Sequence, residues 1–259
     1  MLPAEHRYQV LAPLLSSIRL WPEEGAWSLL QGLLAQLDED LLRNGIVASL
    51  RRRGFGQLSV TSSSQWPWTL RFFDERGALL IELGVWLERL GLQAGERLRV
   101  LSVETLRLQH PYAAFERPRA PSQAHPGLGL ARAFHCLLGD WALRLGADGV
   151  LVLPEFFHTA CIFAQHYRWL DAEMEQLFEA SKRDLLPLVA DATALSWAFE
   201  WGLVRRRGQL WRWPNEAMLR PLGPRAELLL QQRAEAPLLE CSSFELDEGF
   251  QRRWVALDG

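Results

Sequence analysis

The chain has 259 residues, of which 49% are hydrophobic and 23% are charged, and its formal net charge is -3. This length fits one large domain or two small ones, and the apolar fraction is ample for a hydrophobic core. The slightly negative net charge gives no general reason to expect nucleic acid or an anionic membrane as a partner.

Cysteine usage and the N-terminus indicate a cytoplasmic location. The three cysteines, Cys136, Cys161 and Cys241, form no Cys-x-x-Cys pair, and an odd number cannot complete a disulfide framework. We expect free, buried thiols in a reducing compartment. Residues 1–8 lack the basic-then-apolar order of a signal peptide. No apolar run reaches the roughly eighteen residues that span a bilayer, so no membrane partner is expected.

The N-terminal part of the chain predicts helices followed by strands. Apolar residues recur at helical spacing from Trp27 to Leu41, and Asn44-Gly45 is a typical helix stop. A second short helix is expected to end at Arg53. The period then changes to alternation, which is typical of strands. We expect strands over residues 57–61, 69–73, 78–83 and 98–106, the last introduced by a turn at Ala94-Gly95.

The middle of the chain begins with a proline-rich loop over residues 110–126, a length that is usually functional or mobile. Apolar residues at helical spacing then predict a helix over 130–145 that ends at Gly146. A short, wholly apolar strand is expected at 149–153, and a helix over 158–166. Towards the C-terminus we expect helices over 172–184, 192–201 and 225–235, and a hairpin over 202–213 around Arg207-Gly208.

The glycine-rich turn Pro126-Gly127-Leu128-Gly129 runs directly into the predicted helix. Glycines let the backbone turn tightly and approach a ligand without a Cβ in the way. The helix that follows presents unpaired N–H groups and the positive end of its dipole. Such a turn is suited to a phosphate or pyrophosphate, although many turns of this kind are simply helix entries.

The order of elements from Leu98 to Leu170 resembles the GNAT acyltransferase superfamily. Gly129-Leu130-Ala131 matches the last three positions of that family's acyl-coenzyme A motif, while Pro126 stands where the family has Arg or Gln. The buried strand at 149–153 follows as in the family. The segment 159–170 is similar to the next helix, but Phe163 falls where the family has a catalytic Tyr.

This resemblance implies a cofactor, acetyl-CoA or another acyl-CoA, and a set of residues that bind its pyrophosphate. The backbone of the turn is implicated, namely Gly127, Leu128, Gly129, Leu130, Ala131 and Arg132. The resemblance also implies a general base at Glu104, on the strand beside the pantetheine arm. The alternative for Glu104 is an outward-facing carboxylate with no role in chemistry.

Three further residues are candidates for acid–base chemistry. Glu155 follows the buried strand, and His158 is a candidate base near neutral pH, but either could serve only at the start of a helix. Tyr167 is a candidate proton donor in place of Phe163, although it could equally close the core. No metal site is expected, since His110, His125 and His158 have no short ligand spacing.

We therefore expect an α/β fold with a GNAT-like mixed central sheet flanked by helices. Residues 1–180 would form the acyl-CoA-binding domain, and 181–259 a C-terminal α+β extension of helices and a hairpin. The expected function is acyl transfer from acyl-CoA to an amine, on a small molecule or a protein, and a homodimer is left open. A catalytically silent acyl-CoA-binding or protein-interaction module is the first alternative.

The hairpin at 202–213 supports a third hypothesis. Arg205, Arg206 and Arg207 precede Trp211 and Trp213 there, after a predicted helix. This order is similar to the wing of a DNA-binding regulator, in which the tryptophans could stack on bases. Nucleic acid is nevertheless not favoured, because the chain is net acidic and a hairpin that packs its tryptophans on the core explains the same pattern.

Overall fold

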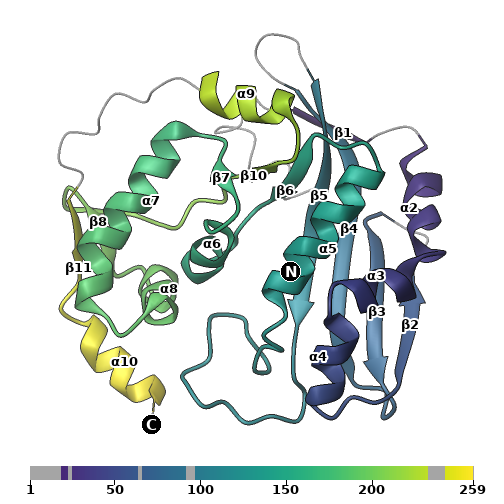
Figure 1. Cartoon of the computed structure of the whole chain (residues 1–259). Helices are drawn as coiled ribbons and strands as arrows, with labels where there is room; N and C mark the ends of the chain where they lie inside the picture. Colours follow the sequence, from purple (N-terminus) through teal and green to yellow (C-terminus); the bar gives the residue numbers. More distant parts are fainter. Residues whose placement is uncertain (1–18, 23–24, 64–65, 92–96, 233–242, 259) are drawn as a thin grey trace. The chain divides into compact units, whose positions relative to one another are not determined.

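The computed structural model describes residues 19–22, 25–63, 66–91, 97–232 and 243–258 (Figure 1). The chain forms two compact units. Of the described residues, the first unit holds those within 1–108, 128–152 and 221–228, and the second holds those within 109–127, 153–220 and 229–259. The predicted boundary after residue 180 falls inside a helix, α7 (Ala172–Leu185). The expectations for residues 1–8, Ala94-Gly95 and Cys241 lie outside the described part.

The first unit is built on a mixed sheet. Antiparallel pairing joins β2 (Leu58–Ser62), β3 (Trp68–Asp74), β4 (Leu79–Gly91) and β5 (Arg97–Leu108) in that order. The short β1 (Arg19–Pro22) pairs with the end of β4. β6 (Gly149–Val152) then pairs with β5 in parallel, with Val100 opposite Gly149 and Val103 opposite Val152. The strands expected at 98–106 and 149–153 are therefore both present, and they pair with each other.

Helices flank this sheet. The first three are α2 (Ala26–Leu34), α3 (Leu37–Arg43) and α4 (Ile46–Arg52), so the apolar stripe predicted as one helix from Trp27 is divided between two. α5 (Ala131–Arg144) connects β5 to β6 and buries Phe134, Leu138 and Trp141. Trp141 contacts Trp68 of β3, with 6.1 Å between ring centroids. α5 therefore covers the face of the sheet on which Trp68 lies.

A buried polar contact joins α5 to α3 in the same unit. Trp141 donates its indole N–H to Asp40 Oδ2 at 2.9 Å, and Arg144 forms an ion pair with the same oxygen. Asp40 is almost fully buried, so both partners are needed to satisfy its charge. This contact places α3 on the same side of the sheet as α5.

The second unit is largely helical. Its helices are α6 (Phe157–Phe163), α7, the 3₁₀ turn η1 (Leu186–Leu188), α8 (Ala192–Glu200) and α10 (Phe250–Asp258). Aspartates cap two of them: Asp171 accepts from Glu173 N–H, and Asp191 accepts from the N–H groups of Thr193 and Ala194. α9 (Pro224–Gln232) has its first residues in the other unit.

The second unit also contains short strands. β7 (Arg168–Trp169) pairs antiparallel with β10 (Met218–Pro221). β8 (Val204–Arg206) lies between β9 (Gln209–Leu210) and β11 (Phe244–Leu246), so the hairpin expected around Arg207-Gly208 is confirmed. Aromatic side chains form the core of this unit, with Phe157 in contact with Phe178, Phe199 and Trp213.

Candidate functional site

The second half of the glycine turn, Leu128-Gly129, lies in the first unit at the start of α5. Gly129 has φ +63°, a left-handed conformation that L side chains rarely adopt. Leu128 and Leu130 on either side are buried, and the Leu128 N–H donates to the carbonyl of Leu108 at the end of β5. The turn is thus anchored by its leucines, while Gly129 itself is exposed.

The beginning of α5 has an arrangement that suits an anion. The N-cap residue, Leu130, has no side chain that can accept a hydrogen bond from the first N–H groups of the helix. α5 is 14 residues long, so its dipole adds positive potential at this end. Ala131 and Arg132 form its first turn, and Arg132 is exposed.

A cation that we did not predict lies at this turn. The Nη2 atom of Arg53, which follows α4, is 3.0 Å from the position that a Cβ on Gly129 would occupy. Arg53 Nη1 donates to the carbonyl of Ser49 at 3.1 Å, which holds the guanidinium in place. The sequence shows Arg53 only as the last residue of a basic run, with no signal that links it to the glycine turn.

Glu104 lies on β5 of the same unit and has an acidic neighbour on β4. Ser102 Oγ donates to Glu104 Oε1 at 3.4 Å. Trp86 is opposite Ser102 and Glu88 is opposite Val100, so Glu88, Ser102 and Glu104 share one face of the sheet. Glu88 is only 1% exposed. Among the described residues, neither of its oxygens has a hydrogen bond of normal geometry.

The environment of Glu88 favours its neutral form. Burial, reinforced by the negative charge of Glu104, raises the pKa of Glu88 to about 7, although the nearby Ser102 hydroxyl opposes the shift. Glu88 thus exchanges a proton in the pH range in which many enzymes work. Nothing in the sequence singles out this residue, because strand periodicity alone does not show which carboxylate is buried.

The other predicted residues belong to the second unit. Glu155 is exposed and precedes Phe156, the N-cap residue of α6, so it lies just before the helix rather than at its cap. Gly127, at the end of the proline-rich loop, also belongs to this unit and forms an isolated bridge with Gln109. The structure therefore groups Glu104 with Leu128 to Arg132 in one unit, and Glu155 with His158 and Tyr167 in the other.

His158 is held by Ser196 of α8. Its Nδ1 atom is 2.9 Å from Ser196 Oγ, and its backbone N–H donates to the same oxygen at 2.8 Å. Ser196 in turn donates its hydroxyl proton to the carbonyl of Ala192. Nδ1 must then carry the proton, and Ser196 is a structural partner rather than a nucleophile. Burial lowers the pKa of His158 to about 4, despite the opposing charge of Asp191, so the imidazole is neutral at pH 7.

Tyr167 is only 1% exposed and contacts Phe163, with ring centroids 5.4 Å apart. Burial raises its pKa well above the ordinary value for tyrosine, although the positive charge of Arg220 partly offsets this. A phenol whose pKa is raised in this way is a weak proton donor. Its surroundings in the second unit resemble those of a core residue.

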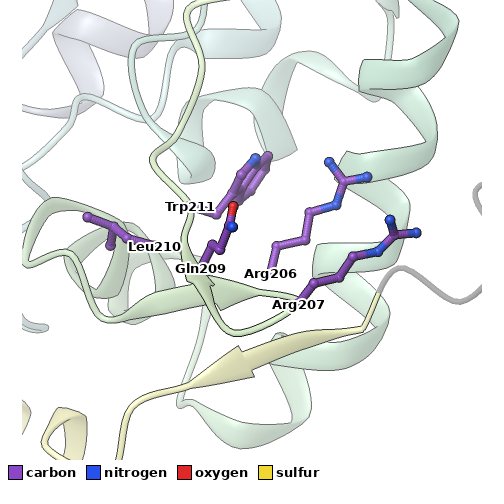
Figure 2. A pocket seen from close by; sticks show the side chains of 5 residues that line it. All are labelled: Arg206, Arg207, Gln209, Leu210 and Trp211. Carbon is purple, nitrogen blue, oxygen red and sulfur yellow. The ribbon is translucent and has the colours of Figure 1, made fainter.

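Residues of the β8–β9 hairpin line the open cavity shown in Figure 2. The cavity has a volume of about 410 Å³ and is lined by Arg206, Arg207, Gln209, Leu210 and Trp211. Trp213, the second tryptophan of the hairpin segment, packs among aromatic rings and donates its indole N–H to the carbonyl of Pro154 at 3.0 Å. The pattern that suggested base stacking is therefore explained at Trp213 by packing in the core of this unit.

No known protein family matches the chain, and no characterised protein matches it significantly. None of the described helices combines the length and apolar character that crossing a bilayer requires. Nor do the described residues include a group of His, Cys, Asp or Glu side chains arranged to hold a metal ion.

Proposed function

We propose that the chain binds an acyl-coenzyme A at the glycine turn of its first unit and transfers the acyl group to an amine. The observation that carries this proposal is the combination of three features at one place. These are the left-handed Gly129, the uncapped start of α5, and the Arg53 guanidinium beside them. Together they offer N–H donors and positive charge to a pyrophosphate.

The sheet supports the same proposal. Parallel β5 and β6 are connected through the turn and α5, which is the order that the GNAT resemblance implies. We extend the proposal to a GNAT-type fold for this unit and to a cytoplasmic location, where thiols such as Cys136 and Cys161 remain reduced.

The proposed chemistry is direct attack of the amine on the thioester carbonyl. The new N–C bond forms as the C–S bond breaks, the nitrogen releases its extra proton to solvent, and the departing coenzyme A thiolate takes a proton from solvent. The amine must first lose the proton of its ammonium form, and we assign that proton to Glu104, directly or through water. Ser102 contacts Glu104 and Glu88 shares their face, so a second carboxyl group with a raised pKa is available next to the base.

A silent acyl-CoA-binding module is the second candidate, and one observation favours it. The family's proton donor is replaced by Phe163, and Tyr167, the nearest phenol in the sequence, is buried with a raised pKa. Reprotonation of a thiolate by water at neutral pH is slow but feasible, so loss of the donor would lower the rate by about ten- to a thousandfold. The two candidates therefore differ in turnover and not in cofactor binding.

Calorimetric titration with acetyl-CoA tests the proposal. We expect binding that weakens in Arg53→Gln and is unchanged in Arg51→Gln, a matched control from the same basic run with an exposed side chain. Absence of binding by the wild type, or equal loss in the two variants, would remove the basis for the proposal. Acyl transfer to a panel of amines, followed against pH, then separates the two candidates. Binding without acylation of any amine favours the silent module.

A further inference from the structure

The hairpin cavity of the second unit combines positive charge with a flat aromatic surface. Figure 2 shows the guanidinium groups of Arg206 and Arg207 extending to the same side of the hairpin, with Trp211 and Gln209 nearby. Its volume of about 410 Å³ falls within the range of small-molecule sites, about 300–1,000 Å³. These features belong entirely to the second unit and are independent of the glycine turn.

The two arginines at this cavity are not neutralised by the part of the chain that the structure describes. Arg205, on the same strand, faces Asp247 at 3.8 Å, but no described carboxylate forms an ion pair with Arg206 or Arg207. The Nε atom of Arg206 is buried and lacks a hydrogen-bond acceptor within the described residues. A buried donor without a partner is uncommon in folded proteins and is explained when a ligand supplies the acceptor.

The turn of the hairpin is strained in a way that points to the same site. Arg207 has φ +52° and Gly208 has φ +75°, the combination of a type I′ turn, in which Asn-Gly is strongly preferred. An arginine at the first position carries a conformational cost that asparagine would largely avoid. The Arg207 side chain lines the cavity, and ligand binding by its guanidinium would explain why an arginine occupies this left-handed position despite the conformational cost.

The Trp211 side chain, which also lines the cavity, is held by two aromatic neighbours. Its ring centroid is 4.7 Å from that of Phe244 and 5.5 Å from that of Phe199. A fixed aromatic ring loses little freedom when a planar group packs against it. The Gln209 amide adds a donor and an acceptor that can read the edge of such a group.

We infer that this cavity binds a mononucleotide, with its phosphate on Arg206 and Arg207 and its base against Trp211. Paired guanidinium groups suit the geometry and charge of a phosphate dianion. A nucleic acid strand is less suited to it, because a strand requires an extended basic track, whereas this is a single cavity on a net acidic chain.

Calorimetric titration of the full chain with AMP tests the inference, with adenosine and inorganic phosphate as partial ligands. We expect AMP to bind with a submillimolar Kd and each partial ligand at least about tenfold more weakly. Arg206→Ala and Arg207→Asn should each weaken AMP binding by about tenfold or more, since each removes a charged contact. Arg212→Ala, an exposed arginine outside the cavity, should have no effect.

Arg207→Asn also separates loss of the site from loss of the fold. Asparagine suits the left-handed position, so we expect the Tm to rise by about 2 °C or more while AMP affinity falls. Coenzyme A itself contains an adenine nucleotide, so the AMP titration is repeated in Gly129→Asp, in which it should be unchanged. AMP binding that depends on Gly129 and not on Arg207 would overturn the assignment to the hairpin.

Three further results would overturn the inference. They are absence of AMP binding at millimolar concentration, inorganic phosphate that binds as tightly as AMP, and unchanged affinity in both arginine variants. A ten-nucleotide oligothymidylate that binds more than about tenfold tighter than AMP, with the same arginine dependence, would show a nucleic-acid surface instead. Acetyl-CoA binding at the glycine turn is tested separately, by the titration of Arg53→Gln.

Discussion

Substitution of Gly129 gives the sharpest test of the proposed pyrophosphate site. Gly129→Asp and Gly129→Ala both add a Cβ at the same position, but only Gly129→Asp adds a negative charge. A Cβ at this position would lie 3.0 Å from Arg53 Nη2, the far end of a flexible side chain that can shift by a few tenths of an ångström. The backbone cost at φ +63° is about 1–2 kcal/mol for alanine. Aspartate tolerates this conformation better than alanine does.

Binding should separate the two variants. In Gly129→Asp the new carboxylate lies next to Arg53, competes with the pyrophosphate for that cation and repels it. A lost charge-assisted hydrogen bond together with repulsion costs about 2 kcal/mol or more, which is roughly a thirtyfold rise in Kd. Gly129→Ala adds no charge and keeps the backbone N–H groups, so we expect the binding free energy of acetyl-CoA to weaken by about 1 kcal/mol or less.

The assay is calorimetric titration with acetyl-CoA at low and at moderate salt, with thermal unfolding of each variant as the folding control. Raising the salt concentration should narrow the gap between Gly129→Asp and Gly129→Ala, because screening weakens exposed charges. Equal losses of affinity in the two folded variants would refute the electrostatic reasoning. Unchanged affinity in Gly129→Asp would refute the site itself.

Three other measurements follow from the described contacts. Burial raises the pKa of Glu88 in the folded state to about 7, so its ionisation destabilises the fold as the pH rises from about 4.5 to 7. The stability that Glu88→Gln gains over the wild type, measured by urea unfolding, should therefore grow over that range by up to about 3 kcal/mol. A difference in stability that does not change with pH would contradict the raised pKa. Glu104→Gln should lower acyl transfer more than Tyr167→Phe, a ranking that pH–rate profiles of both variants check. Asp40→Ala leaves the indole N–H of Trp141 without its acceptor and should cost about 3 kcal/mol in urea unfolding, whereas a loss below about 1 kcal/mol would show that water replaces the carboxylate.

Periodicity in the sequence predicted most elements of the fold, because apolar spacing directly reflects which face of an element is buried. It underestimated β4, which was expected to end at Leu83 but continues to Gly91. Most residues of β4 are buried on both faces of the sheet, so the alternation that marks a half-buried strand is lost. The hairpin at Arg207-Gly208 was predictable because turn chemistry is local.

The candidate site was only partly predictable. The glycine turn is a local pattern and was recognised from sequence, as was Glu104 on its strand. Arg53 reaches the turn, and Glu88 shares a face with Glu104, only because the chain folds back on itself. Contacts between residues so far apart in sequence leave no trace in the periodicity of a single chain, so neither residue could be singled out in advance.

The path of the chain between the two units has a consequence for how this protein can be divided. The chain passes from one unit to the other at residues 108–109, 127–128, 152–153, 220–221 and 228–229. A fragment that ends at Val152 would lack residues 221–228, and with them the Leu222 N–H that donates to Asp148 and the Arg225 guanidinium 3.6 Å from Asp148. No single cut therefore releases an intact first unit. Expression of either unit alone requires its segments to be rejoined by designed linkers or a circular permutation.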